Sequence, residues 1–306
     1  MNTIFISIII TTHNRRYELE KALDSAINQD FVGYEIIVVS DNSNEETKQF
    51  ILEYKNSSDK NIKVIHISQE ESKGANYARN IGIQSAVGEY ICLLDDDDEF
   101  TSDKLKKQFN MITRDDSIGL VYCGSNRIID GKYLKKNAPK LSGDLSKLIF
   151  SRFIGLTSTL CIRKEVFYNV GFFDVNLSHW QDYEMIIRIA QCYRIEYVDE
   201  YLVNIHVNTK SNSRLSNQYD KWLKSVEYIK QKHNNLIEKL PQDIQNSFEY
   251  LILEDAANRN HNIGNKKTHR KNMYILWKKT RRIKYLFRSI FNLSANRIQI
   301  IKGKKI

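Results

Sequence analysis

The chain has 306 residues, of which 42% are hydrophobic, so it holds one large or two ordinary globular domains and is not a disordered protein. No stretch reaches the roughly 18 apolar residues that a membrane-spanning helix needs. The apolar segment 4–10 is too short for a signal peptide and has no basic flank, so we expect a first strand there. The four cysteines form no C-x-x-C pair, which predicts reduced, buried, inert thiols in a cytosolic protein.

The net charge of +9 is distributed unevenly along the chain. Residues 265–306 contain 14 Lys and Arg and no Asp or Glu, which leaves 32 bases against 37 acids in residues 1–264. A mildly acidic body with a strongly basic tail indicates an anionic partner surface, either a membrane or a nucleic acid.

The first half of the chain alternates apolar runs, typical of buried strands, with segments that have helical apolar periodicity. The predicted strands are 5–10, 35–39, 62–67 and 88–94, and the predicted helices between them are 16–29, 44–54 and 77–86. This alternation predicts an α/β fold with a mainly parallel, Rossmann-like sheet, helices on both faces and right-handed connections.

The second half is less regular and ends in helices. It holds a helix at 104–113, a strand at 120–123, a hairpin at 126–134 that turns at Asp130-Gly131, and helices at 219–240, 245–262 and 272–292. We expect an α/β body over residues 1–215 and a helical, basic C-terminal extension over residues 216–306.

Three of the predicted strands end in polar residues. The first is followed by Thr-Thr-His-Asn-Arg at 11–15, the second by Asp-Asn-Ser at 41–43, and the fourth by Asp95 to Asp98. Each segment alone would be explained as a turn or a helix cap. Because ligands of open parallel sheets bind beyond the carboxyl ends of the strands, three such segments on one edge favour a ligand site.

The run Asp95 to Asp98 points to a metal. Carboxylates this close repel and raise each other's pKa, and a hard divalent cation, which usually accompanies a phosphate, would keep them ionised. The alternative is a solvated acidic loop that caps the helix after residues 101–103. The dinucleotide fingerprint and the P-loop are both absent, which argues against a nicotinamide dehydrogenase and a P-loop kinase.

Six segments give the chain a resemblance to family-2 glycosyltransferases of the GT-A fold, of the type that builds bacterial O-antigen, capsule and other surface polysaccharides. They are 10–15, 38–43, 73–82, 93–98, 171–174 and 180–184. They follow the family's order and spacing over roughly residues 3–215, which is far more specific than one motif. The resemblance implies an inverting, metal-dependent transfer of a hexose or N-acetylhexosamine from a UDP-sugar to a glycan hydroxyl. The expected acceptor is linked to a polyprenyl diphosphate.

The resemblance also implies roles for individual residues. The residues expected to contact the nucleotide are Thr11, Thr12, His13, Arg15, Asp41, Arg79, Asp95 and Asp96. The residues expected to bind Mn²⁺ or Mg²⁺ are Asp97, Asp98 and His206. Asp95 and Asp97 form the D-x-D motif, and Asp41 is expected to accept from the uracil or the ribose. For His206, a packed histidine at a strand end is an equal alternative.

Asp182 matches the family's catalytic base, which takes the acceptor hydroxyl's proton as that oxygen attacks the anomeric carbon. Residues 178–181 are typical of a capping box, which would place Asp182 in a first helical turn, where an acid is favoured whatever its function. The family usually has Glu where this chain has Gln181, so an inactive sugar-nucleotide binder stays open. Trp180 is either an acceptor-sugar platform or a core residue.

Residues 273–293 mix aromatic and aliphatic residues with Lys and Arg, as in amphipathic helices that lie on the inner face of an anionic membrane. The alternative is a helix packed on the body with a solvated basic face. We expect a cytoplasmic protein that is peripheral at the membrane through residues 265–306, with no nucleic-acid partner.

Two rival functions use the same features. A sugar-nucleotide nucleotidyltransferase also combines a nucleotide-binding sheet with Mg²⁺, but it usually has a glycine-rich loop after its first strand, and residues 11–15 contain no glycine. A nucleic-acid-binding protein would use the basic tail but would leave the aspartates unexplained.

Overall fold

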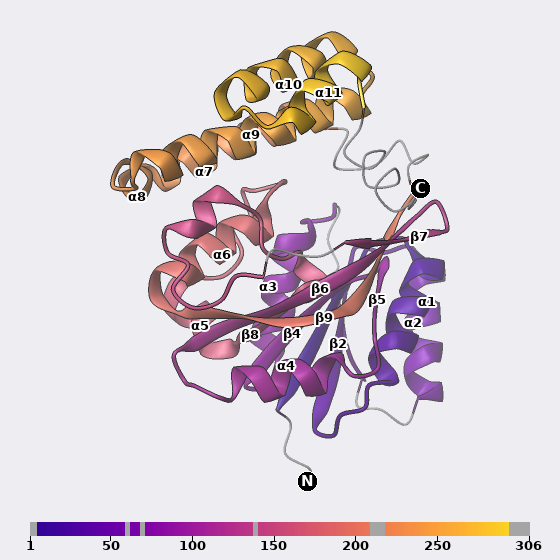
Figure 1. The fold of residues 1–306 in the computed structure, drawn as a ribbon. Coiled ribbons are helices and arrows are strands. Elements are labelled where there is room, and N and C mark those ends of the chain that lie inside the picture. The colour runs from indigo at the N-terminus through magenta and orange to yellow at the C-terminus, as the bar shows by residue number, and fades with distance from the viewer. Residues whose placement is uncertain (1–4, 59–61, 68–70, 137–139, 209–217, 294–306) are drawn as a thin grey trace. The chain divides into compact units, whose positions relative to one another are not determined.

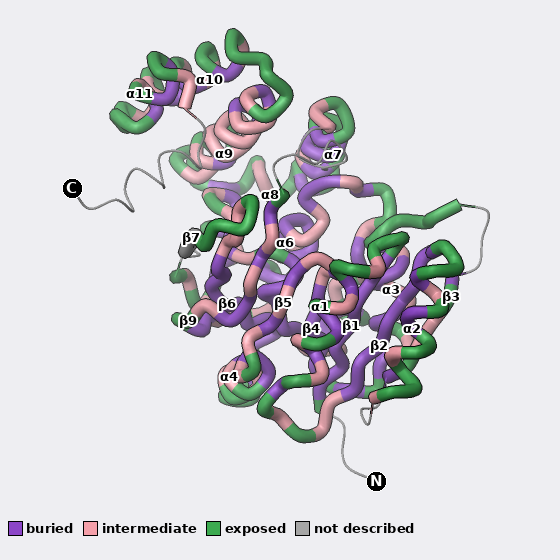
Figure 2. Tube along the Cα trace, turned by 90° about the vertical axis from the view of Figure 1, so that its right-hand side faces the viewer, coloured by how far each residue is buried: buried purple, intermediate pink, exposed green. Residues whose placement is uncertain are grey.

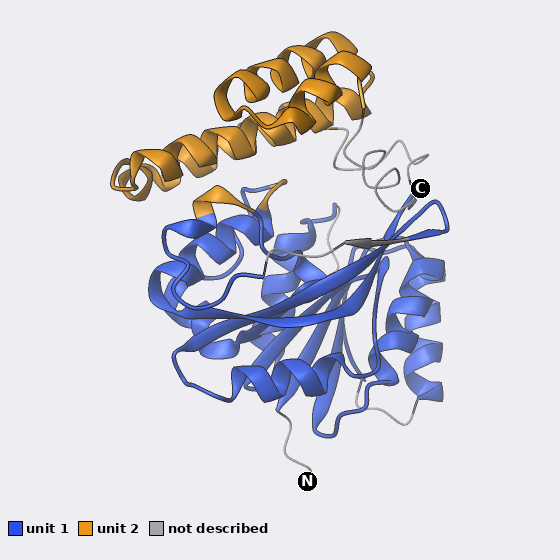
Figure 3. Ribbon diagram, viewed as in Figure 1, with its two compact units in different colours: residues 1–149, 153–177, 181–209 blue, residues 150–152, 178–180, 210–306 orange. Residues whose placement is uncertain are grey.

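The computed structural model describes residues 5–58, 62–67, 71–136, 140–208 and 218–293. The chain forms two compact units (Figure 3). Unit 1 comprises residues 1–149, 153–177 and 181–209, and unit 2 comprises residues 150–152, 178–180 and 210–306. The predicted domain boundary at residue 215 falls in segment 209–217, outside the described residues.

The first half of unit 1 has the predicted alternation of strands and helices (Figure 1). In chain order the elements are β1 (Ile6–Thr12), α1 (Arg16–Ile27), β2 (Tyr34–Asp41), α2 (Glu45–Ser57), β3 (Ile62–Ile67), α3 (Ala75–Ser85) and β4 (Tyr90–Asp95). The strands pair in parallel in the order β3-β2-β1-β4. The carboxyl ends of β1, β2 and β4 therefore meet at one edge, as predicted.

Burial explains why this part of the sequence forms a sheet covered on both faces. All seven residues of β1 are buried, and the central strands β1, β2 and β4 are almost continuously buried (Figure 2). Because right-handed crossovers place helices according to the direction of strand addition, α1 and α2 lie on one face and α3 on the other (Figure 1). Helix α1 turns the stripe Leu19, Ala22, Leu23 and Ala26 toward the core.

The second half of unit 1 completes the sheet. Its elements are β5 (Asp98–Phe100), α4 (Lys104–Ile112), β6 (Ile118–Ile129), β7 (Lys132–Lys136), η1 (Leu148–Ser151), η2 (Thr157–Thr159), β8 (Leu160–Arg163), α5 (Lys164–Val170), α6 (Gln181–Cys192) and β9 (Arg194–Val207). The sheet continues as β4-β8-β6-β9-β5, with β8 antiparallel to both neighbours and β9 parallel to β6. The sheet is thus parallel on one side and mixed on the other.

The predicted hairpin is confirmed, with one difference. Asp130 and Gly131 both have positive φ, as a two-residue turn of type I′ requires. The strand predicted at 120–123 and the first arm of the hairpin are one continuous strand, β6. Three cysteines are buried and unpaired as predicted, but Cys192, the last residue of α6, is exposed.

Unit 2 consists mainly of helices, which are α7 (Tyr219–Lys232), α8 (Asn234–Glu238), α9 (Gln242–Asn262), α10 (Lys266–Thr280) and α11 (Ile283–Phe291). The single helices predicted at 219–240 and 272–292 are each two helices. Helix α10 ends because Arg281 adopts the left-handed conformation, with φ of 55°. The chain then returns, and Tyr285 packs in a small core with Ala257, Met273 and Leu276. Within the described residues, no helix is long and apolar enough to cross a membrane.

Candidate active site

The aspartate turn, Asp95 to Asp98, connects β4 to β5. Asp95 ends β4, and Asp98 begins β5 and pairs with Ile205 of β9. The side chain of Asp97 is 42% exposed, whereas Asp96 and Asp98 are buried. The alternative of a solvated acidic loop therefore does not describe Asp96 and Asp98.

The end of β1 reaches the aspartate turn through Thr12 and Arg15. Thr12 Oγ1 donates to Asp96 Oδ2 at 2.8 Å, and Arg15 Nη1 lies 3.0 Å from Asp96 Oδ1 and 2.8 Å from Asp97 Oδ2. Burial raises the pKa of Asp96 to about 6, although the charge of Arg15 and the hydroxyl of Thr12 act to lower it. With 8% of its side chain exposed, Asp96 holds Thr12 and Arg15 in place and offers a nucleotide little surface.

Arg79, on α3, pairs with the first carboxylate of the turn. Its Nη2 lies 2.7 Å from Asp95 Oδ1, and its Nη1 donates to Asn76 Oδ1. The guanidinium is buried above the ring of Phe173, 5.7 Å from the ring centroid. Thr11, the fourth residue of this group, is buried on β1 opposite Asp95. The structure therefore brings Thr11, Thr12 and Arg15 to the aspartate turn, as predicted from the strand ends, and it also places Arg79 there.

Asp98 lacks a cationic partner in the described part of the chain. Its Oδ2 accepts a 2.6 Å hydrogen bond from Ser158 Oγ. Burial, with added repulsion from Asp95 and Asp97, holds the pKa of Asp98 well above its usual range, although Ser158 and the backbone N–H of His206 act to lower it. Four carboxylates thus face two arginines, and a divalent cation with oxygen ligands fits this excess of negative charge.

His206 is not turned toward the aspartates. Its Nε2 lies 2.6 Å from Oε1 of Glu99, the residue after Asp98 on the neighbouring strand β5. In the ranges that the structure describes, no three His, Cys, Asp or Glu side chains are gathered so that they could hold a metal ion. The predicted trio of Asp97, Asp98 and His206 is therefore not assembled: the imidazole is paired with Glu99, and Asp98 accepts a hydrogen bond from Ser158.

The carboxylate of Asp41, at the end of β2, is hydrogen-bonded to the segment that precedes α3. It accepts hydrogen bonds from Ser72 Oγ and from the backbone N–H groups of Lys73 and Gly74, at 2.5, 3.1 and 2.8 Å. Gly74 has φ of 89°, which few other residues would adopt. Asp41 therefore fixes the start of α3, the helix that carries Arg79, and its buried carboxylate is not open to a uracil or ribose. His13 is exposed, and its Nδ1 lies 2.7 Å from the carbonyl oxygen of Asp41.

Asp182 lies in the first turn of α6, as predicted. Its carboxylate accepts from the backbone N–H of Tyr183 at 2.8 Å and also from that of Thr157. Burial raises the pKa of Asp182 above its usual range, the positive charge of Arg79 opposes this, and the negative charge of Asp95 adds to it. Asp182 is therefore close enough to the Arg79–Asp95 pair for their charges to act on it.

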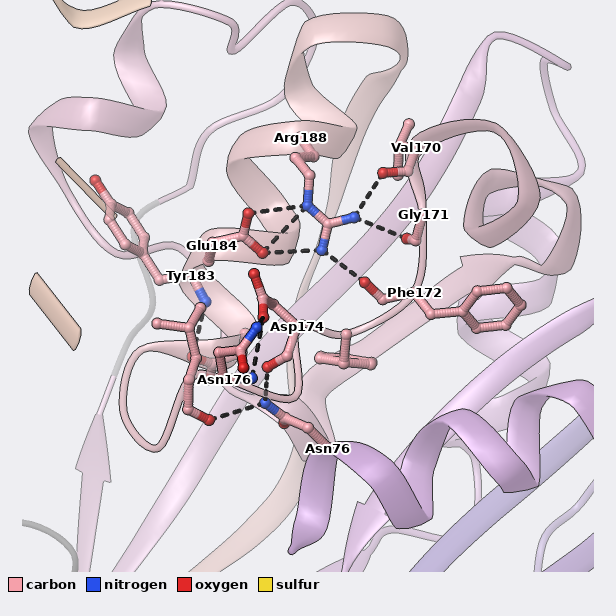
Figure 4. A network of polar contacts seen from close by, with 12 residues as sticks. Asn76, Val170, Gly171, Phe172, Asp174, Asn176, Tyr183, Glu184 and Arg188 are labelled. Atoms are coloured by element: carbon pink, nitrogen blue, oxygen red, sulfur yellow. Dashed lines mark hydrogen bonds and ion pairs between the residues drawn. The ribbon is translucent and has the colours of Figure 1, made fainter. Parts of the chain in front are cut away.

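The Arg188 network, which comprises Arg188, Glu184 and the carbonyl oxygens of residues 170–172, supports this arrangement (Figure 4). Arg188 lies 2.9 Å from each oxygen of the fully buried Glu184 carboxylate and donates to the three carbonyls at 2.6 to 2.9 Å. Asn76 of α3 donates to the carbonyl oxygens of Asp174 and Leu177. The loop between α5 and α6 thus joins the helix of Asp182 to the helix of Arg79.

Trp180, predicted as an acceptor platform or a core residue, belongs to unit 2. Its ring is edge-on to Trp222, with centroids 5.9 Å apart, and its Nε1 donates to Asp255 at 3.0 Å. Only 8% of Trp180 is exposed. The core alternative therefore describes Trp180, because a sugar platform needs an open ring face.

The sequence analysis assigned no role to Ser158, Thr157, Glu184 or Arg188, although Glu184 lies in one of the six segments that carry the resemblance. Glu184 and Arg188 are four residues apart on a helix, a spacing typical of an ion pair, and they interrupt an apolar run. That pattern would have suggested a buried pair. Thr157 and Ser158 lie in a polar triplet between leucines, a weaker signal.

The fold and the site define an α/β protein with a cluster of carboxylates at the carboxyl ends of parallel strands. Comparison with known proteins gives the family. Residues 7–175, more than half of the chain, match the family described as glycosyl transferase family 2, and the chain belongs to this family. Membership favours glycosyl transfer over nucleotidyl transfer and over nucleic-acid binding.

Similar proteins support the same assignment. The amylovoran biosynthesis glycosyltransferase AmsB of Erwinia amylovora is 29% identical over 224 residues, which cover 70% of this chain and 73% of AmsB. Among solved structures, the mannosyltransferase PcManGT of Pyrobaculum calidifontis in complex with GDP-Man and Mn²⁺ has a TM-score of 0.63 at 18% identity, over 89% of this chain and 75% of that chain. S. aureus TarS 1–349 in complex with UDP has a TM-score of 0.57 at 18% identity, over 89% and 86%. These likenesses confirm the GT-A fold.

Proposed function

We propose that this protein is an inverting, metal-dependent glycosyltransferase that moves a hexose or N-acetylhexosamine from a UDP-sugar to a hydroxyl of a glycan. The observation that carries the proposal is the convergence of Asp182, the Arg79–Asp95 pair and the aspartate turn at one edge of the sheet. A base and an anion-rich, cation-binding cluster are the two components that such a transfer requires.

Asp182 acts as the general base. It takes the proton of the acceptor hydroxyl while the hydroxyl oxygen attacks the anomeric carbon. The bond from that carbon to the diphosphate oxygen breaks, and its electron pair leaves with UDP. A carboxylate whose pKa is raised by burial is a stronger base than an exposed one, and the N–H groups of Tyr183 and Thr157 fix its direction. No protein nucleophile is needed.

The carboxylates of Asp95, Asp97 and Asp98 would hold Mn²⁺ or Mg²⁺ only after they move closer together, because no three such side chains of the described residues are gathered for a metal. The buried Asp98 carboxylate, which has no cationic partner in the described part of the chain, supports this choice. When bound, the metal supplies positive charge to the departing diphosphate. His206 would become a ligand only after release from Glu99. The Mn²⁺ in the PcManGT complex supports a divalent metal in this protein but does not decide between Mn²⁺ and Mg²⁺.

The nucleotide would lie against the ends of β1 and β4, where Thr11, Thr12, His13, Arg15 and Arg79 supply polar and cationic groups. His13 and Arg15 are the exposed members of this group. The TarS structure contains UDP and the PcManGT structure contains GDP-Man, so proteins of this fold bind uridine and guanosine nucleotides. We propose UDP as the nucleotide of the donor, because the polar segments at the strand ends resemble those of the glycosyltransferase family described above.

The acceptor is a surface-polysaccharide intermediate linked to a polyprenyl diphosphate, which the role of AmsB in amylovoran biosynthesis supports. Residues 1–215 form the catalytic domain, and residues 216–306 bring it to the cytoplasmic face of an anionic membrane. The charge of residues 265–306, with 14 bases and no acid, supports this location.

A donor-hydrolysis assay tests the proposal. The purified full chain is incubated with each member of a panel of UDP-sugars and with GDP-mannose, in Mn²⁺, in Mg²⁺ or in chelator, and nucleotide release is measured. We expect slow, metal-dependent release from one UDP-sugar. Equal nucleotide release with metal and with chelator would contradict the proposed metal dependence. Release from GDP-mannose alone would contradict the proposed UDP-sugar donor.

A further inference from the structure

Helix α11 presents its apolar face to solvent. Ile283, Phe287, Ile290 and Phe291 are 50 to 65% exposed, and the rings of Phe287 and Phe291 are stacked, with centroids 6.0 Å apart. At 100° for each residue, these four positions fall within one arc of about 100°. They form a continuous stripe along one side of the helix, which we call the α11 stripe.

The opposite side of α11 is polar and buried. Tyr285, Arg288 and Ser289 are the buried residues of this helix. Tyr285 Oη donates to Glu254 Oε2 at 2.6 Å, Arg288 donates to Glu254 and Asn258 of α9, and Ser289 Oγ donates to the carbonyl oxygen of Arg270. The usual orientation of an amphipathic helix is thus reversed, because hydrogen bonds hold its polar face inside the unit.

Exposed cations lie beside the α11 stripe in the sequence. Lys278, Lys279, Arg281, Arg282 and Lys284 are all exposed. Residues 265–306 contain no acid, and Lys284 has an acid partner outside this segment, with its Nζ 3.6 Å from Glu254 Oε1. An apolar stripe flanked by an excess of exposed cations complements a surface that offers both acyl chains and anionic groups.

We propose that α11 is a membrane-inserted anchor: the α11 stripe enters the boundary between acyl chains and headgroups of an anionic bilayer. The flanking cations meet the lipid phosphates. This inference rests on the membrane part of the proposed function and deepens it, since it adds apolar insertion to charge attraction. A second copy of the chain is a poorer occupant of the stripe, because two surfaces this basic repel each other.

Vesicle flotation with the full chain tests the anchor. The wild type is compared with Phe287→Ser/Phe291→Ser and with the control Val32→Ser/Val87→Ser, which removes two other exposed apolar side chains. Vesicles contain either phosphatidylglycerol with phosphatidylcholine or phosphatidylcholine alone. On anionic vesicles we expect the α11 variant to partition about a hundredfold more weakly than wild type, as the loss of two inserted rings implies, and the control to match wild type.

Salt separates insertion from attraction. High salt screens the charge attraction but leaves apolar insertion, so wild type should retain binding to anionic vesicles in 1 M salt and the α11 variant should lose it. Equal flotation of the two proteins under both conditions would overturn the proposal. So would a wild-type dimer in light scattering that becomes a monomer in the variant, since the stripe would then be a subunit interface.

Donor hydrolysis without vesicles distinguishes this inference from the proposed function. Because the α11 stripe is exposed, its substitutions should leave both hydrolysis and the thermal unfolding temperature unchanged. If no donor is hydrolysed but flotation behaves as expected, the enzymatic proposal fails and the anchor stands. If hydrolysis occurs and flotation does not depend on the stripe, the reverse holds.

Discussion

The Arg188 network and the aspartate turn are two charged clusters of the same unit, and they differ in how far their charge is neutralised. Nε and Nη2 of Arg188 donate to the buried Glu184 carboxylate. The remaining N–H groups of the guanidinium donate to backbone carbonyl oxygens. Among the residues that the structure describes, the cationic partners of the four aspartates are Arg15 and Arg79. The neutralised cluster holds the loop that positions Asp182, and the under-neutralised one is suited to bind a cation.

The largest expected effect comes from opening the neutralised cluster. Arg188→Met leaves the Glu184 charge buried and unpaired, which costs about 3–5 kcal/mol of the free energy of unfolding in urea titrations. The double variant Glu184→Gln/Arg188→Met removes both charges and should recover part of that loss. A double variant that is less stable than the single one would show that charge neutralisation is not what the pair supplies.

A smaller effect is expected from the pH dependence of the aspartate turn. The pKa of Asp96 is about 6 in the folded chain against an ordinary 3.8, so the folded state binds the proton more tightly. Its contribution to stability is complete below the ordinary pKa and falls as the pH rises from about 4 to about 6, by on the order of 3 kcal/mol. Asp96→Asn should have a flatter dependence of unfolding free energy on pH in metal-free buffer. A slope equal to that of wild type would contradict the assigned burial.

Removal of the unpaired charge itself should stabilise the chain. Asp98→Asn eliminates a buried carboxylate that has no cationic partner among the described residues, so we expect a gain in the free energy of unfolding in metal-free buffer at neutral pH. The same substitution should abolish Mn²⁺-dependent donor hydrolysis. The matched control is Asp97→Asn, which alters a more exposed carboxylate and should change stability less. A loss of stability in Asp98→Asn would mean that the charge is already neutralised.

The smallest effect concerns the contact that holds Asp98. Ser158→Ala removes the 2.6 Å hydrogen bond to Asp98 and should raise the pKa of that carboxyl further. We expect weaker Mn²⁺ binding in calorimetry, by a few-fold, with a change in unfolding free energy below about 1 kcal/mol. Ser146→Ala, which removes a hydroxyl that interacts with Asp144, is the control. Unchanged Mn²⁺ affinity in Ser158→Ala would show that Asp98 is not a metal ligand.

The strand-end residues of the site could be predicted from sequence, because the carboxyl ends of parallel strands meet wherever the pattern of strands is clear. Thr12, Arg15 and the four aspartates follow from β1 and β4 alone. The partners of Asp41 could not be predicted, since they depend on how residues 72–74 wrap over β2. His206 is a similar case, because strand register rather than residue type places it beside Glu99.

The helical unit shows the same limit. The periodicity of residues 283–291 reveals an apolar face but not which face is buried. That outcome depends on Glu254 and Asn258, about 30 residues earlier in the chain. The break at Arg281 carries no glycine or proline signal, so local sequence favoured one continuous helix over 272–292.

The most direct test of the account is transfer by Asp182→Asn. With the donor and metal identified by hydrolysis, sugar transfer to a lipid-linked acceptor is measured for wild type and variant, along with donor affinity and the pH profile of transfer. For the variant we predict unchanged donor affinity and a loss of transfer by a factor of about 10² to 10⁴. For wild type we predict that the transfer rate falls at acidic pH with an apparent pKa above the ordinary range of aspartate. Transfer at the wild-type rate in Asp182→Asn would contradict the assignment of Asp182 as the base.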